Sequence, residues 1–136
     1  MAVLALTNAK VVVNSVDLSD HVRKVTLKTS ADDLDTTAMS SSGYRSRIGG
    51  LKEGEVSLEF NEDFASGSVD GTLFAALGTV VAVTVKAVNT TTAATNPEYQ
   101  FSVLVTEHTP LDASVGDLAT VSVSWPTTST ITRATS

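Results

Sequence analysis

Residues 51–61 read LKEGEVSLEFN, and this stretch decides the fold class. Apolar side chains occupy every second position from 56 to 60, and Glu, Ser or Asn occupies the positions on either side of them. Successive side chains of a strand point to opposite faces, so this alternation predicts a strand with one buried face and one wet face. The expected polar face comprises Glu55, Ser57, Glu59 and Asn61.

A second alternating strand is predicted over residues 22–30. If the two strands pair with their apolar faces together, Lys24 faces Glu59 and Lys28 faces Glu55. One interpretation is that these residues form cross-strand ion pairs. The other is that the polar face lines a wet space, because residues 51–63 hold five acids and one Lys. Both interpretations can hold together.

Residues 31–50 separate these two strands and contain three Asp, four Ser and three Gly, without a hydrophobic period. They are predicted to form a long inter-strand loop, which in a compact domain usually means function or disorder. The acids lie in the first half of the loop and the bases in the second. The charged residues are Asp32, Asp33, Asp35, Arg45 and Arg47.

Further strands are predicted over residues 10–16, 79–88, 99–105 and 121–125. The Val-rich segment 79–88 is expected to be buried on both faces. The one helix is predicted over Val69–Leu77, with Ser68 as its N-cap, Leu77 on its apolar face and Gly78 at its end.

The fold class is therefore mainly β: an antiparallel β-sandwich or partly open barrel with one short α-helix and a long inter-strand loop. The 136 residues form a single domain, 1–136, with an N-terminal arm at 1–9 and a Ser/Thr-rich tail at 127–136. The net charge of −6 argues against gripping nucleic acid through its phosphates. No signal peptide and no apolar run of membrane-spanning length is recognised, so no membrane partner is expected.

No catalytic or metal-binding residues, no cofactor and no enzymatic activity are predicted. The chain has no Cys, and His21 and His108 are expected to be solvated loop residues. The Asp32, Asp33 and Asp35 cluster lacks the Gly and Glu positions of a calcium-binding loop.

Several segments, taken in order, resemble the major tail (tail tube) proteins of siphophages. The resemblance covers roughly residues 10–126, and the order of the elements carries more weight than any single motif. The resembling segments are Arg47–Asp63, Gly67–Asp70, Leu73-Phe74, Asn96–Tyr99, Ser114–Asp117 and Trp125-Pro126.

This resemblance implies a subunit that assembles into stacked, hexameric rings with an acidic lumen through which DNA passes. The lumen-facing residues would be Glu55, Ser57, Glu59, Lys24 and Lys28. The loop carrying Asp32, Asp33, Asp35, Arg45 and Arg47 would reach a neighbouring ring. The N-terminal arm would contact a neighbour through Val3, Leu4 and Leu6. The chain is short for the family and lacks an immunoglobulin-like decoration domain.

The expected partners are copies of the same chain and other phage tail proteins such as the tape measure, terminator and distal tail proteins. DNA would be only a non-specific passing cargo. The expected location is the virion, after synthesis in the bacterial host cytoplasm. The alternatives are a head–tail connector or tail terminator ring protein, or a β-sandwich adhesion or binding module.

Overall fold

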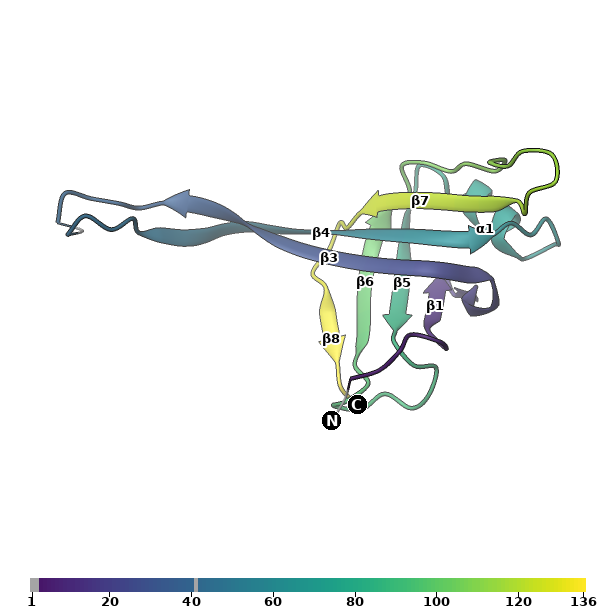
Figure 1. Ribbon diagram of the computed structural model, residues 1–136, viewed down its shortest axis with the longest axis horizontal. Coiled ribbons are helices and arrows are strands. Elements are labelled where there is room, and N and C mark those ends of the chain that lie inside the picture. The colour runs from purple at the N-terminus through teal and green to yellow at the C-terminus, as the bar shows by residue number, and fades with distance from the viewer. Residues whose placement is uncertain (1–2, 41) are drawn as a thin grey trace.

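The computed structural model describes residues 3–40 and 42–136 as two antiparallel sheets and one helix (Figure 1). The prediction of a mainly β fold with one short helix is confirmed. The elements are β1 (Lys10–Val13), β2 (Val16–Asp17), η1 (Ser19–His21), β3 (Val22–Asp35), β4 (Arg47–Asn61), α1 (Val69–Ala76), β5 (Val80–Lys86), β6 (Glu98–Leu104), β7 (Thr120–Pro126) and β8 (Thr132–Ala134).

The two sheets pack face to face and do not close into a barrel. One sheet has the strand order β2-β1-β5-β6-β8, and the other has the order β3-β4-β7. The strands of the two sheets cross steeply (Figure 1). Within the smaller sheet, β3 and β7 are the two edge strands.

Alternating apolar residues from both sheets form one core, as the sequence pattern predicts. Its central side chains include Val56, Phe60, Val103, Val121 and Trp125, all fully buried. Burial of side chains of this size contributes roughly 1.5–3 kcal/mol each before chain entropy is subtracted.

The prediction that the 79–88 strand is buried on both faces is wrong. In β5, Val81, Val83 and Val85 are buried, whereas Val80 and Ala82 are exposed. β5 lies between β1 and β6 in a sheet that is covered on one face by the other sheet, so alternate side chains meet solvent.

The strand predicted over residues 10–16 is instead a hairpin. Asn14 and Ser15 both have positive φ, 50° and 67°, and Val13 pairs with Val16 across them. A two-residue loop with positive φ at both positions matches the right-handed twist of the flanking strands. The chain therefore turns back within the predicted strand.

Helix α1 ends one residue before the predicted boundary. Ser68 occupies the N-cap position, but its hydroxyl donates to Asp63 Oδ2 at 2.8 Å instead of capping the helix. Gly78 has a φ of +81°, which glycine adopts without a Cβ clash. The expectation that Leu77 faces the core is wrong: it is half exposed where the helix has already ended.

The β3–β4 hairpin has the predicted register, with Lys24 opposite Glu59 and Lys28 opposite Glu55. The prediction of a 31–50 loop is wrong, because β3 continues to Asp35 and β4 begins at Arg47. Strand pairing continues there without an apolar face, since both strands satisfy each other's backbone groups away from any core.

The C-terminal segment crosses from one sheet to the other. The Thr127 N–H donates to the Gly54 carbonyl at 2.9 Å, and the Thr128 N–H donates to the Ser102 carbonyl at 2.8 Å. Beyond them β8 pairs with β6, so the predicted tail contributes an edge strand to the larger sheet. We call residues 127–131 the strap. Among the described residues, no helix is long and apolar enough to cross a membrane.

Candidate functional site

The outer face of the β3-β4-β7 sheet is polar across all three strands. A shallow open hollow of 480 Å³ lies on it. The hydroxyls of Ser57 and Ser124 lie 3.2 Å apart on paired strands, so the polar rows of β4 and β7 meet. The lining residues are Lys24, Thr26, Ser57, Leu58, Glu59, Glu107, Ser122, Val123 and Ser124. We call this surface the polar face.

The ion pair on this face differs from the predicted ones. Glu59 Oε1 lies 3.3 Å from Nη1 of Arg23, not beside the amine of Lys24. A register shift between Val22 and Lys24 places Arg23 as the extra residue of a β-bulge, which aims its side chain toward Glu59.

The carboxylate of Glu55 accepts a hydrogen bond from the Ser124 hydroxyl. Within residues 3–40 and 42–136, no ion pair joins Lys24 to Glu59 or Lys28 to Glu55. The predicted register is thus confirmed, whereas the predicted ion pairs are wrong.

Glu107 lies along the outer edge of β7. Its Oε1 accepts the backbone N–H of Ser124 at 2.8 Å, and its carbonyl accepts the Trp125 indole N–H at 3.0 Å. Backbone N–H groups two residues apart point to the same edge of a strand, and Pro126 has none. A further strand beside β7 would need free backbone N–H donors at residues 124 and 126. The Glu107 side chain already accepts the first of these N–H groups, and Pro126 lacks the second.

The far part of the β3–β4 hairpin projects away from the body (Figure 1). The last pairing of β4 with β7 is Glu55 with Pro126, so residues 29–53 have no third strand beside them. We call residues 29–53 the hairpin arm. The predicted large excursion between the two strands is therefore an extended hairpin, in which β3 ends at Asp35 and β4 begins at Arg47.

The charged residues of the arm pair across the hairpin. Arg47 Nη1 lies 2.6 Å from Asp33 Oδ2, and Arg45 Nη1 lies 3.2 Å from Asp35 Oδ2. Hydrogen bonds from the hydroxyl and the backbone N–H of Thr37 lower the pKa of Asp35. Asp32 is exposed on the same strand. The segregated charges thus meet within one chain, and their predicted contact with a neighbour stays a prediction.

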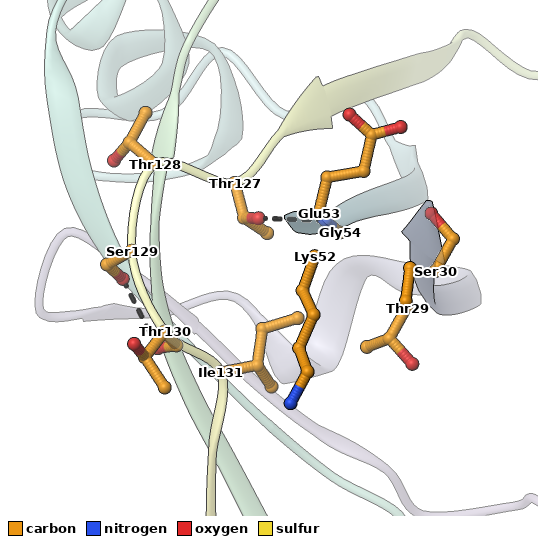
Figure 2. Close-up of a pocket in the computed structure, with 11 residues that line it drawn as sticks. Thr29, Ser30, Lys52, Glu53, Gly54, Thr127, Thr128, Ser129, Thr130 and Ile131 are labelled. Carbon is orange, nitrogen blue, oxygen red and sulfur yellow. Dashed lines mark hydrogen bonds between the residues drawn. The ribbon is translucent and has the colours of Figure 1, made fainter. Parts of the chain in front are cut away.

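A groove of 870 Å³ lies where the arm leaves the body, beside the strap (Figure 2). Thr29 and Ser30 come from β3, Lys52 and Glu53 from β4, and residues 127–131 from the strap. Gly54 forms its floor, with its N–H donating to Thr127 Oγ1 at 3.1 Å. The groove is open and rich in hydroxyl groups. It lies between the base of the arm and the strap.

The N-terminal segment is hydrogen-bonded to the body at Asn8. The Asn89 N–H donates to the Asn8 carbonyl at 2.8 Å. Before that anchor, Val3, Leu4 and Leu6 are exposed. Their predicted contact with a neighbouring copy stays a prediction.

The histidines contact acids beside α1. His21 Nε2 lies 2.8 Å from Asp63 Oδ2, and His108 Nε2 lies 3.3 Å from Asp70 Oδ1. The expectation of a solvated His108 is wrong, because its side chain is only 2% exposed and packs edge-on against the Phe74 ring.

Two carboxylates beside these histidines have shifted pKa values. Hydrogen bonds from the Ala65 N–H and the Ser68 hydroxyl lower the pKa of Asp63. Burial raises the pKa of Glu62. Among the residues that the structure describes, no three His, Asp or Glu side chains group as metal ligands.

Sequence reasoning missed Arg23, Glu107 and the strap as parts of these surfaces. A β-bulge adds one residue without a clear signal in the pattern. Glu107 reaches its partner Ser124 only through the fold. The Ser/Thr-rich composition of residues 127–136 gave no apolar period from which a strand could be predicted.

No family model and no curated protein matches this chain. Solved structures match its fold. A chain in the virion of a native gene transfer agent particle has a TM-score of 0.73 at 15% identity, and the match covers 93% of this chain and 95% of that chain. A chain in the tail of an empty gene transfer agent particle with C6 symmetry has a TM-score of 0.62 at 16% identity, and the match covers 84% and 82%. At these identities the likeness establishes a shared fold.

Proposed function

We propose that this chain is a structural subunit of a phage or phage-like tail, in which its copies form stacked rings around a DNA channel. The observation that carries the proposal is the fold shared, over nearly the whole of both chains, with a chain of the gene transfer agent virion. The C6 symmetry of the second matching structure supports a hexameric ring for this chain.

The smaller sheet supports ring formation by its two edge strands, although Glu107 and Pro126 occupy two donor positions on the edge of β7. β3 is a 14-residue edge strand, and β7 is the opposite edge strand of the same sheet. An unpaired edge presents backbone donors and acceptors to any further strand. If β3 of one copy lies beside β7 of the next, the sheet continues around a closed ring and no free edge remains.

In such a ring the polar face lines the lumen, with Glu55, Ser57, Glu59, Lys24 and Lys28 inward. Glu55 is bonded to a hydroxyl rather than to a base, so its carboxylate is not neutralised by an ion pair. An acidic lining repels phosphates, so DNA passes as cargo without being held. The assembled tube then belongs to a virion, alongside tape measure, terminator and distal tail proteins.

The hairpin arm and the N-terminal segment supply contacts beyond the ring. The paired strands of the arm have no third strand beside them over seven residues of β3, Thr29–Asp35, and extend roughly 24 Å at the rise of an antiparallel strand. In the proposed stack the arm contacts a neighbouring ring, and the exposed Val3, Leu4 and Leu6 suit an apolar contact with a neighbour.

Negative-stain microscopy of the concentrated protein tests this proposal. Long tubes are expected from the full chain. A variant lacking Ser40–Arg47 keeps the body and is expected to stop at single rings or monomers, because its arm is shortened. Rings without tubes from the full chain would favour a connector or terminator ring, and particles without rings would refute the proposal.

A further inference from the structure

Exposed apolar side chains gather at the end of the body opposite the arm. They come from two segments, residues 64–80 and 111–118. Six of them are Phe64, Phe74, Val80, Leu111, Val115 and Leu118, each at least 59% exposed. We call the exposed apolar side chains of these two segments the end patch.

The two segments lie side by side. The Glu62 N–H donates to the Ala119 carbonyl at 3.0 Å, which joins the start of one segment to the end of the other. His108 links them again through Asp70 and the edge of the Phe74 ring. The helix and the 106–119 loop occupy the same end of the molecule in Figure 1. The two segments that carry the end patch therefore lie beside each other at one end of the molecule.

The segments that carry the end patch are rich in acids, two of which, Asp63 and Asp70, contact His21 and His108. The segments 62–85 and 105–119 contain no Lys or Arg. Their acids are Glu62, Asp63, Asp70, Glu107, Asp112 and Asp117. A partner for this surface would therefore combine exposed apolar groups with positive charge.

The tip of the hairpin arm offers that combination, whereas Asp32, Asp33 and Asp35 lie nearer the body. Its apolar side chains Met39, Tyr44 and Ile48 are exposed, and they lie among residues 36–48, where Arg45 and Arg47 are the charged residues. Both arginines keep more than half of their side-chain surface exposed while paired with their acids.

One chain cannot bring these two surfaces together. The arm tip and the end patch lie at opposite ends of the molecule (Figure 1). A contact between them must join two copies, and it joins different surfaces of the two. Such a head-to-tail contact repeats without limit along an axis unless a rotation closes it.

We propose that the end patch is the docking surface for the hairpin arm of a second copy of this chain. This inference rests on the proposed function, since it specifies where the arm of one ring contacts the next ring. The Met39 and Tyr44 side chains pack on the Leu111 and Val115 region, while the arginines face the surrounding carboxylates. The contact orients every ring in the same direction along the tube.

Cysteine cross-linking tests this docking, because the chain has no Cys of its own. Met39→Cys and Val115→Cys are made in separate chains, at side chains that pack on nothing within their own chain. The two proteins are mixed, allowed to polymerise and treated with a short bismaleimide. A linked dimer is expected in the mixture at a yield at least tenfold above that from Met39→Cys mixed with Ala94→Cys. Ala94 is an exposed site in the β5–β6 connection.

The outcomes separate this inference from the proposed function. Tubes that give no more tip-to-patch dimer than the Ala94→Cys control would overturn the docking and leave the tail function standing. Failure of the wild-type chain to form rings or tubes at any concentration would overturn both. Tubes with the linked dimer support both, and mass spectrometry of the linked peptides identifies the two residues.

Discussion

Ile131 lies across Gly54 so closely that a Cβ on residue 54 would come within 2.5 Å of the Ile131 Cδ1. Thr127 borders the same space, with its Oγ1 at 3.1 Å. The contact lies at the base of the hairpin arm, where the strap is bonded to β4 on both the N–H and carbonyl sides of Gly54. Glycine at this position thus allows the strap to hold the two sheets together.

Gly54→Ala is expected to lower the free energy of unfolding by about 1 kcal/mol, the low end of the cost of overpacking, because the nearest atom is the end of the flexible Ile131 side chain. Urea denaturation measures the change. Gly49→Ala is the matched control and should be nearly neutral, because a Cβ there meets nothing within 4 Å. Ile131→Ala should remove most of the penalty in the double variant. An equal cost in both backgrounds would show that Ile131 is not the cause.

Glu107→Ala is expected to increase self-association, because it removes the acceptor that holds the Ser124 N–H on the edge of β7. Light scattering during polymerisation should show a shorter lag for Glu107→Ala than for the wild type. Glu107→Gln is the matched control: it removes the charge but keeps an acceptor oxygen. If the two variants behave alike, charge and not edge protection is responsible.

The alternation of residues 51–61 predicted the register of the β3–β4 hairpin correctly, since one-residue slips would expose Val56 and Phe60. It also predicted that Glu55, Ser57 and Glu59 share a face away from the core. The length of the hairpin could not be predicted in the same way. Beyond Leu51 the pairing continues outside the body, where no burial imposes an alternating pattern.

The sheet face on which each charged residue lies was easier to predict than the residue that it contacts. Arg23 replaces Lys24 beside Glu59 because of one extra residue in β3. His108 meets Asp70 across 38 residues of sequence. Such contacts depend on how two sheets and a helix pack, which no local pattern encodes.

Asp63→Asn should weaken the dependence of the free energy of unfolding on pH under acidic conditions. Its lowered folded pKa means that ionised Asp63 stabilises the fold above the unfolded value of about 3.9. That contribution is lost as pH falls through the lowered folded pKa. The variant should therefore be less stable than the wild type at pH 7, with a smaller difference near pH 2, as measured by denaturation across pH.

Glu62→Gln is a control that should change the free energy of unfolding at neutral pH in the opposite direction. Burial raises the folded pKa of Glu62, so the neutral form is favoured and its contribution is lost as pH rises through that value. The Gln variant should gain stability over the wild type at neutral pH, and the gain should fade below the unfolded value of about 4.3. A parallel loss in both variants at every pH would contradict the assignment of the two carboxylates.

The Asp33–Arg47 pair is expected to act within one chain, at 2.6 Å and with both side chains more than half exposed. Asp33→Arg with Arg47→Asp restores the pair in reversed order, so it should recover most of the roughly 0.2–1 kcal/mol that Asp33→Arg alone loses. If the double variant recovers none of this loss, the two side chains do not stabilise each other within the chain.

Glu55→Lys and Glu59→Lys, singly and together, are expected to convert the lumen from repelling to retaining DNA. Each change replaces a carboxylate on the polar face with an amine, and the phosphates of a passing duplex then meet positive charge over many stacked rings. Assembled tubes of the double variant should retain a short DNA duplex at low salt and release it as salt rises, whereas wild-type tubes should not retain it. Asp20→Lys makes the same single charge change at an exposed residue of η1, outside the polar face, and should leave DNA passage unchanged. Double-variant tubes that pass DNA like the wild type would remove Glu55 and Glu59 from the lumen.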